Sequence, residues 1–404
     1  MALHISLNVL INALFLFASF FLGLPIAVLF VECMTGILPK KTQKQQYSKV
    51  RPKVAILIPA HNEAASIGTT LSFLAQSENS AHLIVIADNC TDETATIARE
   101  YGATVLQRQD LLHRGKGYAL DYGLQFLKST IPPDVVAIVD ADCIVNTGAI
   151  QQLVQKAHAL NRPVQATNLL RPPLQFTHKD TVATLAFMVK NLVRQRGLQR
   201  LGLPVSLTGT GMALPWALVN KVTFATGNLV EDKQLGIDLT IAGYAPVFCE
   251  EALVTGYFPQ EKQAKNTQKV RWVHGHLQTF LTQVPQMIHL SLVQKRFDLL
   301  AVALDLAIPP LSILCAIWLA MTALALFSSL FFTSSWITMI FIGEGLLLFT
   351  AVFATWLRFG RSYIKLQSLL SIPVYVLENI NVSLSFVISP QKEWVRTKRD
   401  KVIK

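Results

Sequence analysis

Long apolar runs stand near both ends of this chain and frame a central part in which short apolar runs alternate with polar ones. Residues 5–31 contain no charged residue and form a run long enough for a helix that crosses a bilayer. Residues 306–357 contain Glu344 as their one charged residue and predict two crossing helices, joined by a tight turn near 328–335. Glu344 would either be paired within the helix bundle or line an acceptor path, and we expect the pairing.

A further apolar stretch, residues 366–387, gives a weaker pattern because polar residues interrupt it. These residues are Pro373, Glu378, Asn379 and Asn381. A helix that lies on the membrane surface, or is partly inserted, fits this composition better than a full span. The basic tail at 392–404 then stays on the side of the membrane that holds the central part.

The central part alternates strand patterns with helix patterns. Strands are predicted at 54–59, 83–87, 103–107 and 135–139. Helices are predicted at about 64–76, in the segment that ends near 101, and at about 118–129. Strands that alternate with helices predict an α/β fold with a doubly wound, mostly parallel sheet.

Acidic side chains close these predicted strands at one edge of the sheet. Glu63 follows the first strand, Asp88 the second, and Asp140 and Asp142 the strand at 135–139. Open α/β sheets bind their ligands at this edge. Alternate side chains of an extended backbone share a side, so Asp140 and Asp142 could hold one divalent cation, and that cation a diphosphate. Because surface Asp-x-Asp pairs are common, the pair alone is a weak signal.

Beyond the predicted sheet, residues 181–203 have apolar side chains at helical spacing with basic residues between them. The basic residues are Lys190, Arg194, Arg196 and Arg200. This pattern predicts either a helix lying on the membrane surface or an ordinary surface helix of the globular domain. Small residues at 207–212 predict a loop whose backbone approaches a ligand closely. Helices are also predicted from 229 to 242 and from 268 onward.

The composition supports a membrane protein. Hydrophobic residues make up 51% of the chain and charged residues 15%, well below the roughly 25% charged residues of soluble domains. The net charge is +11, and the basic residues cluster beside apolar segments, which favours contact with anionic lipid head groups over nucleic acid. The five cysteines are scattered without a Cys-x-x-Cys pair, which predicts free thiols in a reducing compartment.

A basic run after the first apolar segment orients the chain. It contains Lys40, Lys41, Lys44, Lys49, Arg51 and Lys53 without an acidic residue, so the positive-inside rule puts the central part in the cytosol. We therefore expect a multi-pass protein of the cell membrane, inner or plasma. Its predicted parts are a transmembrane anchor at 1–34, a basic juxtamembrane linker at 35–53, a cytosolic domain at 54–297, two transmembrane helices at 298–358, and an interfacial helix with a basic cytosolic tail at 359–404.

Four motifs in order along the chain carry a resemblance to a known family. They are Pro59-Ala-His-Asn-Glu63 with Asp88, the pair Asp140-x-Asp142, the pair Glu231-Asp232, and Gln268-x-x-Arg271-Trp272. With these motifs, residues 54–272 resemble the membrane-bound family 2 glycosyltransferases, which include the synthases of cellulose, hyaluronan and poly-N-acetylglucosamine and ceramide glucosyltransferase. The sequence departs from the family at Val230, where the family usually has threonine before the two carboxylates.

The resemblance implies a GT-A type sheet that binds a nucleotide sugar, usually a uridine diphosphate sugar, and a cofactor, Mg²⁺ or Mn²⁺. Glu63 and Asp88 would hold the uridine. Asp142 would hold the metal, and Asp140 would contact the ribose or share the metal. Lys116, in a Gly-Lys-Gly loop at a helix start, would face a phosphate or the uracil; a solvated lysine in a flexible loop is the alternative.

The resemblance also implies roles on the acceptor side of an inverting transfer. Asp232 would take the proton of the acceptor hydroxyl, and Glu231 would orient the acceptor or its loop; complementing the helix macrodipole is the alternative for this pair. Arg271 would stabilise the leaving pyrophosphate. Trp272 would stack on the acceptor sugar or anchor the chain at the membrane interface. Gln268 and the loop at Thr208 and Gly209 would complete the pocket.

The acceptor remains open between two membrane-associated classes. The Gln-x-x-Arg-Trp motif favours a growing polysaccharide, which would need an export partner subunit or an oligomer to cross the membrane. Transfer of a single sugar to a lipid acceptor is the alternative. A non-catalytic nucleotide-binding membrane protein is the alternative of another class. His274 and His276 show no spacing for zinc and are interpreted as ordinary polar residues.

Overall fold

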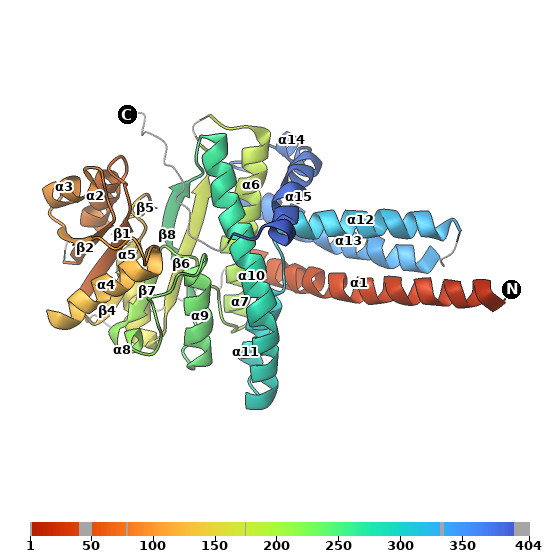
Figure 1. Cartoon of the computed structure of the whole chain (residues 1–404), viewed down its shortest axis with the longest axis horizontal. Helices are drawn as coiled ribbons and strands as arrows, with labels where there is room; N and C mark the ends of the chain where they lie inside the picture. The colour runs from red at the N-terminus through yellow and green to blue at the C-terminus, as the bar shows by residue number, and fades with distance from the viewer. Residues whose placement is uncertain (1, 40–50, 78–79, 174, 332–334, 392–404) are drawn as a thin grey trace.

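The computed structural model describes residues 2–39, 51–77, 80–173, 175–331 and 335–391 and has two parts, a sheet flanked by helices and a group of long helices (Figure 1). The basic residues at 40–50 and the tail at 392–404 lie outside the described residues. In Figure 1 the long helices α1, α12 and α13 extend together away from the sheet. Helices α10 and α15 cross these long helices at the end that is nearest to the sheet.

One mixed sheet of eight strands forms the core of the first part. The strands are β1 (Val54–Ala60), β2 (His82–Asp88), β3 (Thr104–Arg108), β4 (Val135–Ile138), β5 (Ile144–Val145), β6 (Val164–Arg171), β7 (Met212–Pro215) and β8 (Val247–Tyr257). Their order is β3-β2-β1-β4-β7-β6-β8-β5. β1 pairs in parallel with β2 and β4, β2 with β3, and β6 with β8, whereas β7 is antiparallel to β4 and β6. The predicted α/β fold with a mostly parallel sheet is confirmed.

The sequence pattern predicted β1 to β4 but not β5 to β8. β6 carries Gln165 and Asn168, two polar residues that are buried in the sheet. Their polar character hides the strand in a hydrophobicity pattern, and only their partners in the folded protein make their burial favourable. β7 is short, and β8 pairs with β6 through a register shift next to Ala166.

Helices cover both faces of this sheet because successive side chains of each strand point to opposite faces. Ile56 and Ile58 pack with α2 (Ile67–Ser77), α3 (Thr94–Glu100) and α5 (Ala149–Leu160). Ala55 and Leu57 pack on the other face, with α4 (Lys116–Ser129), α8 (Trp216–Val219) and α9 (Glu231–Ile241). The helices cover the two faces of the sheet but leave open the edge at which the parallel strands have their carboxyl ends.

Within the part of the chain that the structure describes, four helical segments are long and apolar enough to cross a membrane, judged by length and composition. They are Asn8–Ile37 in α1 (Ala2–Ile37), Leu311–Ser329 as α12, Ser335–Gly360 in α13 (Ser335–Thr355) with its continuation, and Leu366–Ile388 in α14 (Leu366–Leu369) and α15 (Ile372–Ile388). α15 packs against α6, α10 and α12. The predicted surface placement of this last segment stays a prediction, because its length alone would also permit a span.

Glu344 is paired inside the bundle, as expected. It is buried, and its Oε1 accepts a hydrogen bond of 2.7 Å from the Ser19 hydroxyl of α1. Gly23, on the same helix, leaves the room that this carboxylate occupies, since a Cβ there would stand 2.9 Å from Oε1. All five cysteines are free thiols, as predicted.

The basic segment at 181–203 differs from both interpretations of its sequence. It folds as α6 (His178–Met188), a π-helical segment η1 (Val189–Arg194) and α7 (Gln195–Arg200). Arg194 and Arg196 are buried inside the protein rather than exposed on a surface. Arg194 donates to Glu32 of α1 at 2.6 Å, and Arg196 forms an ion pair with Glu250 of β8. Glycine permits this packing, because a Cβ at Gly197 would overlap the carbonyl group of Glu32.

The Gln-x-x-Arg-Trp motif lies inside a helix rather than at its start. α10 runs from Lys262 to Gln294, followed by α11 (Phe297–Leu306). The motif occupies the second and third turns of α10. Its side chains therefore project from regular helix rather than from a helix end. The predicted helix from 229 is confirmed as α9, with Glu231 and Asp232 in its first turn.

Candidate active site

A cavity of about 2070 Å³ lies between the open edge of the sheet and the helices next to the long bundle. One end, here called the sheet end, is lined by residues at strand ends and at the start of α4: Asn62, Glu63, Asp88, Lys116, Asp140 and Asp142. The other, the helix end, is lined by Lys190, Lys233, Arg271, Trp272 and His276 and by residues 308–312. Every residue that the sequence singled out for chemistry lines this cavity, including Thr208, Gly209, Glu231, Asp232 and Gln268.

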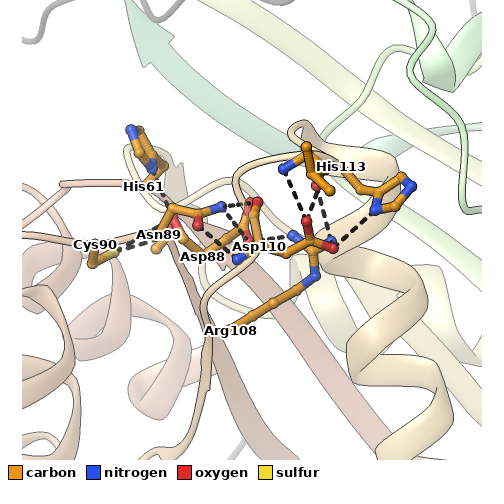
Figure 2. A network of polar contacts seen from close by, with 9 residues as sticks. His61, Asp88, Asn89, Cys90, Arg108, Asp110 and His113 are labelled. Atoms are coloured by element: carbon orange, nitrogen blue, oxygen red, sulfur yellow. Dashed lines mark hydrogen bonds and ion pairs between the residues drawn. The ribbon is translucent and has the colours of Figure 1, made fainter.

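Asp88 is the most enclosed carboxylate of the sheet end, with 6% of its surface exposed. Its Oδ1 accepts hydrogen bonds from Arg108 Nη1 at 2.7 Å and from Asn89 Nδ2 at 3.1 Å (Figure 2). Burial raises the pKa of Asp88 above its ordinary value, and the hydrogen bond from Arg108 opposes that rise. Asp88 is therefore fixed in place by a guanidinium from the neighbouring strand.

Arg108 also ties the next loop to the sheet. Its Nη2 donates to Asp110 Oδ2 at 2.9 Å, and Asp110 Oδ1 accepts from the backbone N–H groups of Leu112 and His113, both at 3.0 Å. The hydrogen bond from the His113 backbone lowers the pKa of Asp110 below its ordinary value. The sequence pattern did not identify Arg108, because the pairing of β3 with β2 that brings it to Asp88 is decided only in the folded protein.

The ends of β1 and β2 are tied together by Asn62 and Glu63. Asn62 adopts a left-handed backbone conformation with φ +56, which asparagine tolerates better than most residues. Its Oδ1 accepts from the backbone N–H of Thr91 at 2.7 Å, and the Glu63 N–H donates to Thr94 Oγ1 at 2.8 Å. These contacts put Glu63 and Asp88 on the same side of the cavity.

Lys116 is held in place rather than solvated, so the alternative of a flexible lysine is wrong. Its ammonium group forms an ion pair with Asp140 and donates to the carbonyl oxygen of Gly209 at 2.6 Å. Burial acts against the charged form, but the charges of Asp140 and Glu231 outweigh it and raise the pKa of Lys116. Gly115 precedes it with φ +131, a conformation that residues with a Cβ rarely adopt.

Asp140 and Asp142 have the chemistry of a site for a hard divalent cation. Their carboxylate oxygens and the Cys143 sulfur lie within 4.8 Å of one another. Burial, with the charges of Asp142 and Asp140, raises the pKa of Cys143 well above its ordinary value. A thiol is also a softer ligand than a carboxylate. The two carboxylates suit Mg²⁺ or Mn²⁺, which prefer oxygen ligands.

Two residues of β6 that the sequence did not single out hold the loop around Gly209. Gln165 accepts from the Thr208 N–H at 2.8 Å and donates to the Thr210 carbonyl at 2.9 Å. Asn168 donates to the Thr208 hydroxyl at 3.2 Å. The loop then runs through Gly209 at φ +87. The backbone conformation of this side of the cavity is therefore set by buried amides of the sheet.

Glu231 and Asp232 stand between the two ends of the cavity. A Cβ placed on Gly209 would lie 3.4 Å from Asp232 Oδ2, so Asp232 approaches the loop closely. Burial and then the charge of Asp232 raise the pKa of Glu231 to about 7, while Lys116 and Arg271 lower it. Next to each other at a helix start, these carboxylates differ in their surroundings.

The α10 motif supplies an aromatic wall. The Trp272 ring lies 5.9 Å from that of Phe187, centroid to centroid, with 40° between their planes. Gln268 is buried beside it. Trp272 is thus part of the cavity wall. His274, in contrast, fastens α15 to α10, since its Nε2 lies 3.1 Å from the Ser385 hydroxyl of α15. Its Nδ1 accepts from the Gln391 N–H, just beyond that helix, at 3.0 Å.

Comparison with known proteins gives a consistent picture. A family profile described as "Glycosyltransferase like family 2" matches residues 52–275, more than half of the chain. The probable glycosyltransferase YdaM of Bacillus subtilis is 27% identical over 267 residues, which are 62% of this chain and 61% of the relative. The 4,4'-diaponeurosporenoate glycosyltransferase of Staphylococcus aureus is 35% identical over 104 residues, 26% of this chain and 28% of the relative. The chain thus matches less than two thirds of the length of either relative.

Among solved structures, the mannosyltransferase PcManGT from Pyrobaculum calidifontis, in complex with GDP-Man and Mn²⁺, has a similar fold. The TM-score is 0.55 at 15% sequence identity, over 94% of this chain and 99% of that one. At this identity the similarity concerns the fold, which is GT-A-like, with apolar helices at the termini.

Proposed function

The chain belongs to the glycosyltransferase-like family 2, and on that basis we propose that it transfers a sugar, with inversion, from a uridine diphosphate sugar to a membrane-associated acceptor. The observation that carries this proposal is that Asp142, Asp232 and Arg271 line one cavity. They come from a strand end, a helix start and a helix interior that lie far apart in the sequence. A protein that only binds nucleotides would not need a carboxylate such as Asp232 between the two ends of the cavity. It would also not need that carboxylate to be separate from Asp140 and Asp142 at the strand end.

The sheet end suits the donor. Glu63 and Asp88 hold the nucleoside, as the edge of the sheet opens at their strand ends. Lys116 and Arg271 supply positive charge for the diphosphate. Mg²⁺ or Mn²⁺ on Asp142, with Asp140 shared between the cation and Lys116, would neutralise the charge that develops on the departing diphosphate.

The transfer is a single displacement. The acceptor oxygen forms a bond to the anomeric carbon while the bond from that carbon to the diphosphate oxygen breaks. The electron pair of the broken bond stays on the nucleoside diphosphate, and the proton of the acceptor hydroxyl passes to Asp232. Glu231, whose pKa is raised to about 7, is partly protonated near neutral pH and orients the acceptor.

We also propose that the protein is a multi-pass protein of the cell membrane with its sheet domain in the cytosol. Support comes from the four helices of sufficient length and apolar character. The cavity reaches residues 308–312, directly before and into α12. An acceptor held in the bilayer therefore has a short path to Asp232.

Two acceptors have specific support. The intact Gln268-x-x-Arg271-Trp272 motif in the cavity wall favours a growing polysaccharide, which would need an export partner or an oligomer. The apolar residues of the helix end favour a single transfer to a lipid. Product sizing with a radiolabelled donor separates the two, because a polymer gives a ladder and a glycolipid gives one product.

The direct test is a screen of uridine and guanosine diphosphate sugars with the full-length protein in detergent, with Mg²⁺ or Mn²⁺. We expect release of nucleoside diphosphate with one uridine diphosphate sugar. Release with guanosine diphosphate sugars alone would correct the donor. Nucleotide binding without release from any donor would instead support a non-catalytic nucleotide-binding protein.

A further inference from the structure

Two lysines of the helix end have no carboxylate partner among the described residues. Lys190 comes from η1, is exposed to the cavity, and lines it opposite α9. Lys233 follows Asp232 in α9 and has 8% of its surface exposed. Among the described residues, the ammonium group of Lys233 has one hydrogen-bond partner, the neutral ring of His276, with 2.6 Å between Nζ and Nδ1. A buried ammonium group without a counter-charge is costly and rare in proteins.

The electrostatics of the cluster point to a missing negative charge. Burial, followed by the charge of Lys190, lowers the pKa of Lys233 to about 7. Burial, followed by Lys233 and Lys190, lowers the pKa of His276 well below its ordinary value, although the backbone of Ile308 acts in the opposite direction. His276 Nε2 is buried and makes no hydrogen bond within the described part of the chain.

The neighbouring charges do not fill this gap. Arg194 binds Glu32 and Asp305, and Asp305 also accepts from the Ser206 hydroxyl at 2.8 Å. Asp305 attracts both lysines from a distance, whereas Arg194 repels them. Neither lysine forms an ion pair with Glu32 or Asp305 among the described residues. Asp232 also attracts both lysines from a distance. The lysines are thus the groups at this end that an anion could bind without breaking an existing ion pair.

The position of the lysines relates the anion to the reaction and to the membrane. Asp232, the proposed base, precedes Lys233 in the sequence. The same cavity is also lined by Leu29 of α1 and by Ile308, Pro310 and Leu311 at the start of α12. An occupant with a negative head at the lysines would have its apolar part along these residues and its nearby hydroxyl close to Asp232.

We propose that Lys190 and Lys233, with His276 as a hydrogen-bonding neighbour, form a subsite for the anionic head group of an amphiphilic acceptor, a phosphate or a carboxylate. This inference rests on the proposed function and names the chemical class of the acceptor. The hydroxyl that attacks the anomeric carbon lies beside the anion and gives its proton to Asp232, while the diphosphate leaves with the electron pair. The anion itself forms no bond and only positions the acceptor.

The test measures equilibrium binding to the full-length protein in a neutral detergent. Dodecyl phosphate and dodecanoate are the probes, and dodecanol and inorganic phosphate are the comparison ligands. The variants are Lys190→Gln, which is exposed to the cavity and leaves packing intact, and Lys233→Met, which keeps the buried volume. Lys128→Gln, on the solvent side of α4, is the matched control.

We expect saturable binding of one or both anionic amphiphiles, weakened roughly 10- to 100-fold by either subsite substitution and unchanged in Lys128→Gln. If dodecanol binds equally well, the site does not require an anionic head group. If inorganic phosphate binds equally well, the site does not require an amphiphile. Either result would overturn the proposal. If the variants shift only the acidic limb of the pH–rate profile and bind the amphiphiles normally, the lysines serve to keep Asp232 ionised and the subsite does not exist. Specific amphiphile binding without diphosphate release from any donor would retain the subsite and reject the proposed function.

Discussion

The sheet end and the helix end of the cavity differ in how their charges are balanced. At the sheet end, Asp88 is paired with Arg108 and Asp140 with Lys116. At the helix end, Lys190 and Lys233 have no carboxylate partner among the described residues, and Lys233 is buried. The first end is organised before any ligand arrives, whereas the second has a charge that an occupant could balance. Under the proposed function, this difference means that the donor geometry is fixed in advance and that the acceptor completes its own site.

The largest effect is expected at the carboxylate between the two ends. Asp232→Asn should lower transfer by about 10²- to 10⁴-fold while donor binding is retained, because the amide cannot accept the proton. Turnover and donor binding are measured on the same preparation. Asp238→Asn is the control, since Asp238 lies on the same helix and bonds Gln234 at 2.8 Å. Turnover at the unmodified rate in Asp232→Asn would remove this residue from the base role.

The next effect concerns the cation at the sheet end. Exhaustive chelation, or Asp142→Asn, should reduce transfer by about 10²-fold or more, since a bound cation supplies several kcal/mol of charge stabilisation. Added Mn²⁺ or Mg²⁺ should restore the chelated enzyme. Asp134→Asn is the matched control, because Asp134 lies just before the opposite end of β4 and accepts a hydrogen bond from the Lys53 N–H at 2.7 Å. Full activity after chelation would contradict the metal site.

The third prediction compares how a substitution at each end of the cavity changes the free energy of unfolding. Arg108→Gln leaves Asp88 buried without its guanidinium and should lower the free energy of unfolding by about 3 kcal/mol. Lys190→Gln, at the helix end, should leave that free energy nearly unchanged, because it breaks no ion pair. Denaturation in detergent measures both, with Arg99→Gln on the exposed side of α3 as control. Equal losses for Arg108→Gln and Lys190→Gln would remove the contrast between the ends.

The smallest expected effect concerns how the free energy of unfolding changes with pH, because Glu231 and Lys233 should change it in opposite directions. The pKa of Glu231 is raised from 4.5 to about 7, so the folded state holds this proton more tightly and stability falls as pH rises through that window. The pKa of Lys233 is lowered from 10.5 to about 7, so stability rises with pH between those values. Glu231→Gln should remove the fall and Lys233→Met the rise, each on the order of 1–3 kcal/mol. Unfolding free energies between pH 4.5 and 10 measure this; slopes of the same sign would contradict it.

The candidate residues were predictable where chemistry follows a local pattern. Asp88, Asp140 and Asp142 could be identified because an apolar run ends directly before them, and a strand end is a local feature. Arg108 and Lys233 were missed for the opposite reason. Nothing beside Arg108 in the sequence indicates that β3 lies next to β2, and nothing beside Lys233 indicates that it is buried. Arg194 and Arg196 were predicted at a surface because their partners Glu32, Asp305 and Glu250 lie far away along the chain.

The sequence by itself determined the alternation of strands and helices, the acidic strand ends, the apolar helices and the motif residues. These properties depend on the spacing of side chains along a few turns or one strand, which the order of residues fixes directly. The tertiary structure alone decided the four later strands, the burial of two arginines, and the meeting of Lys190, Lys233 and His276. Each of these depends on a partner from a distant segment, and the free energy of burying a polar group is set by that partner rather than by its neighbours in the chain.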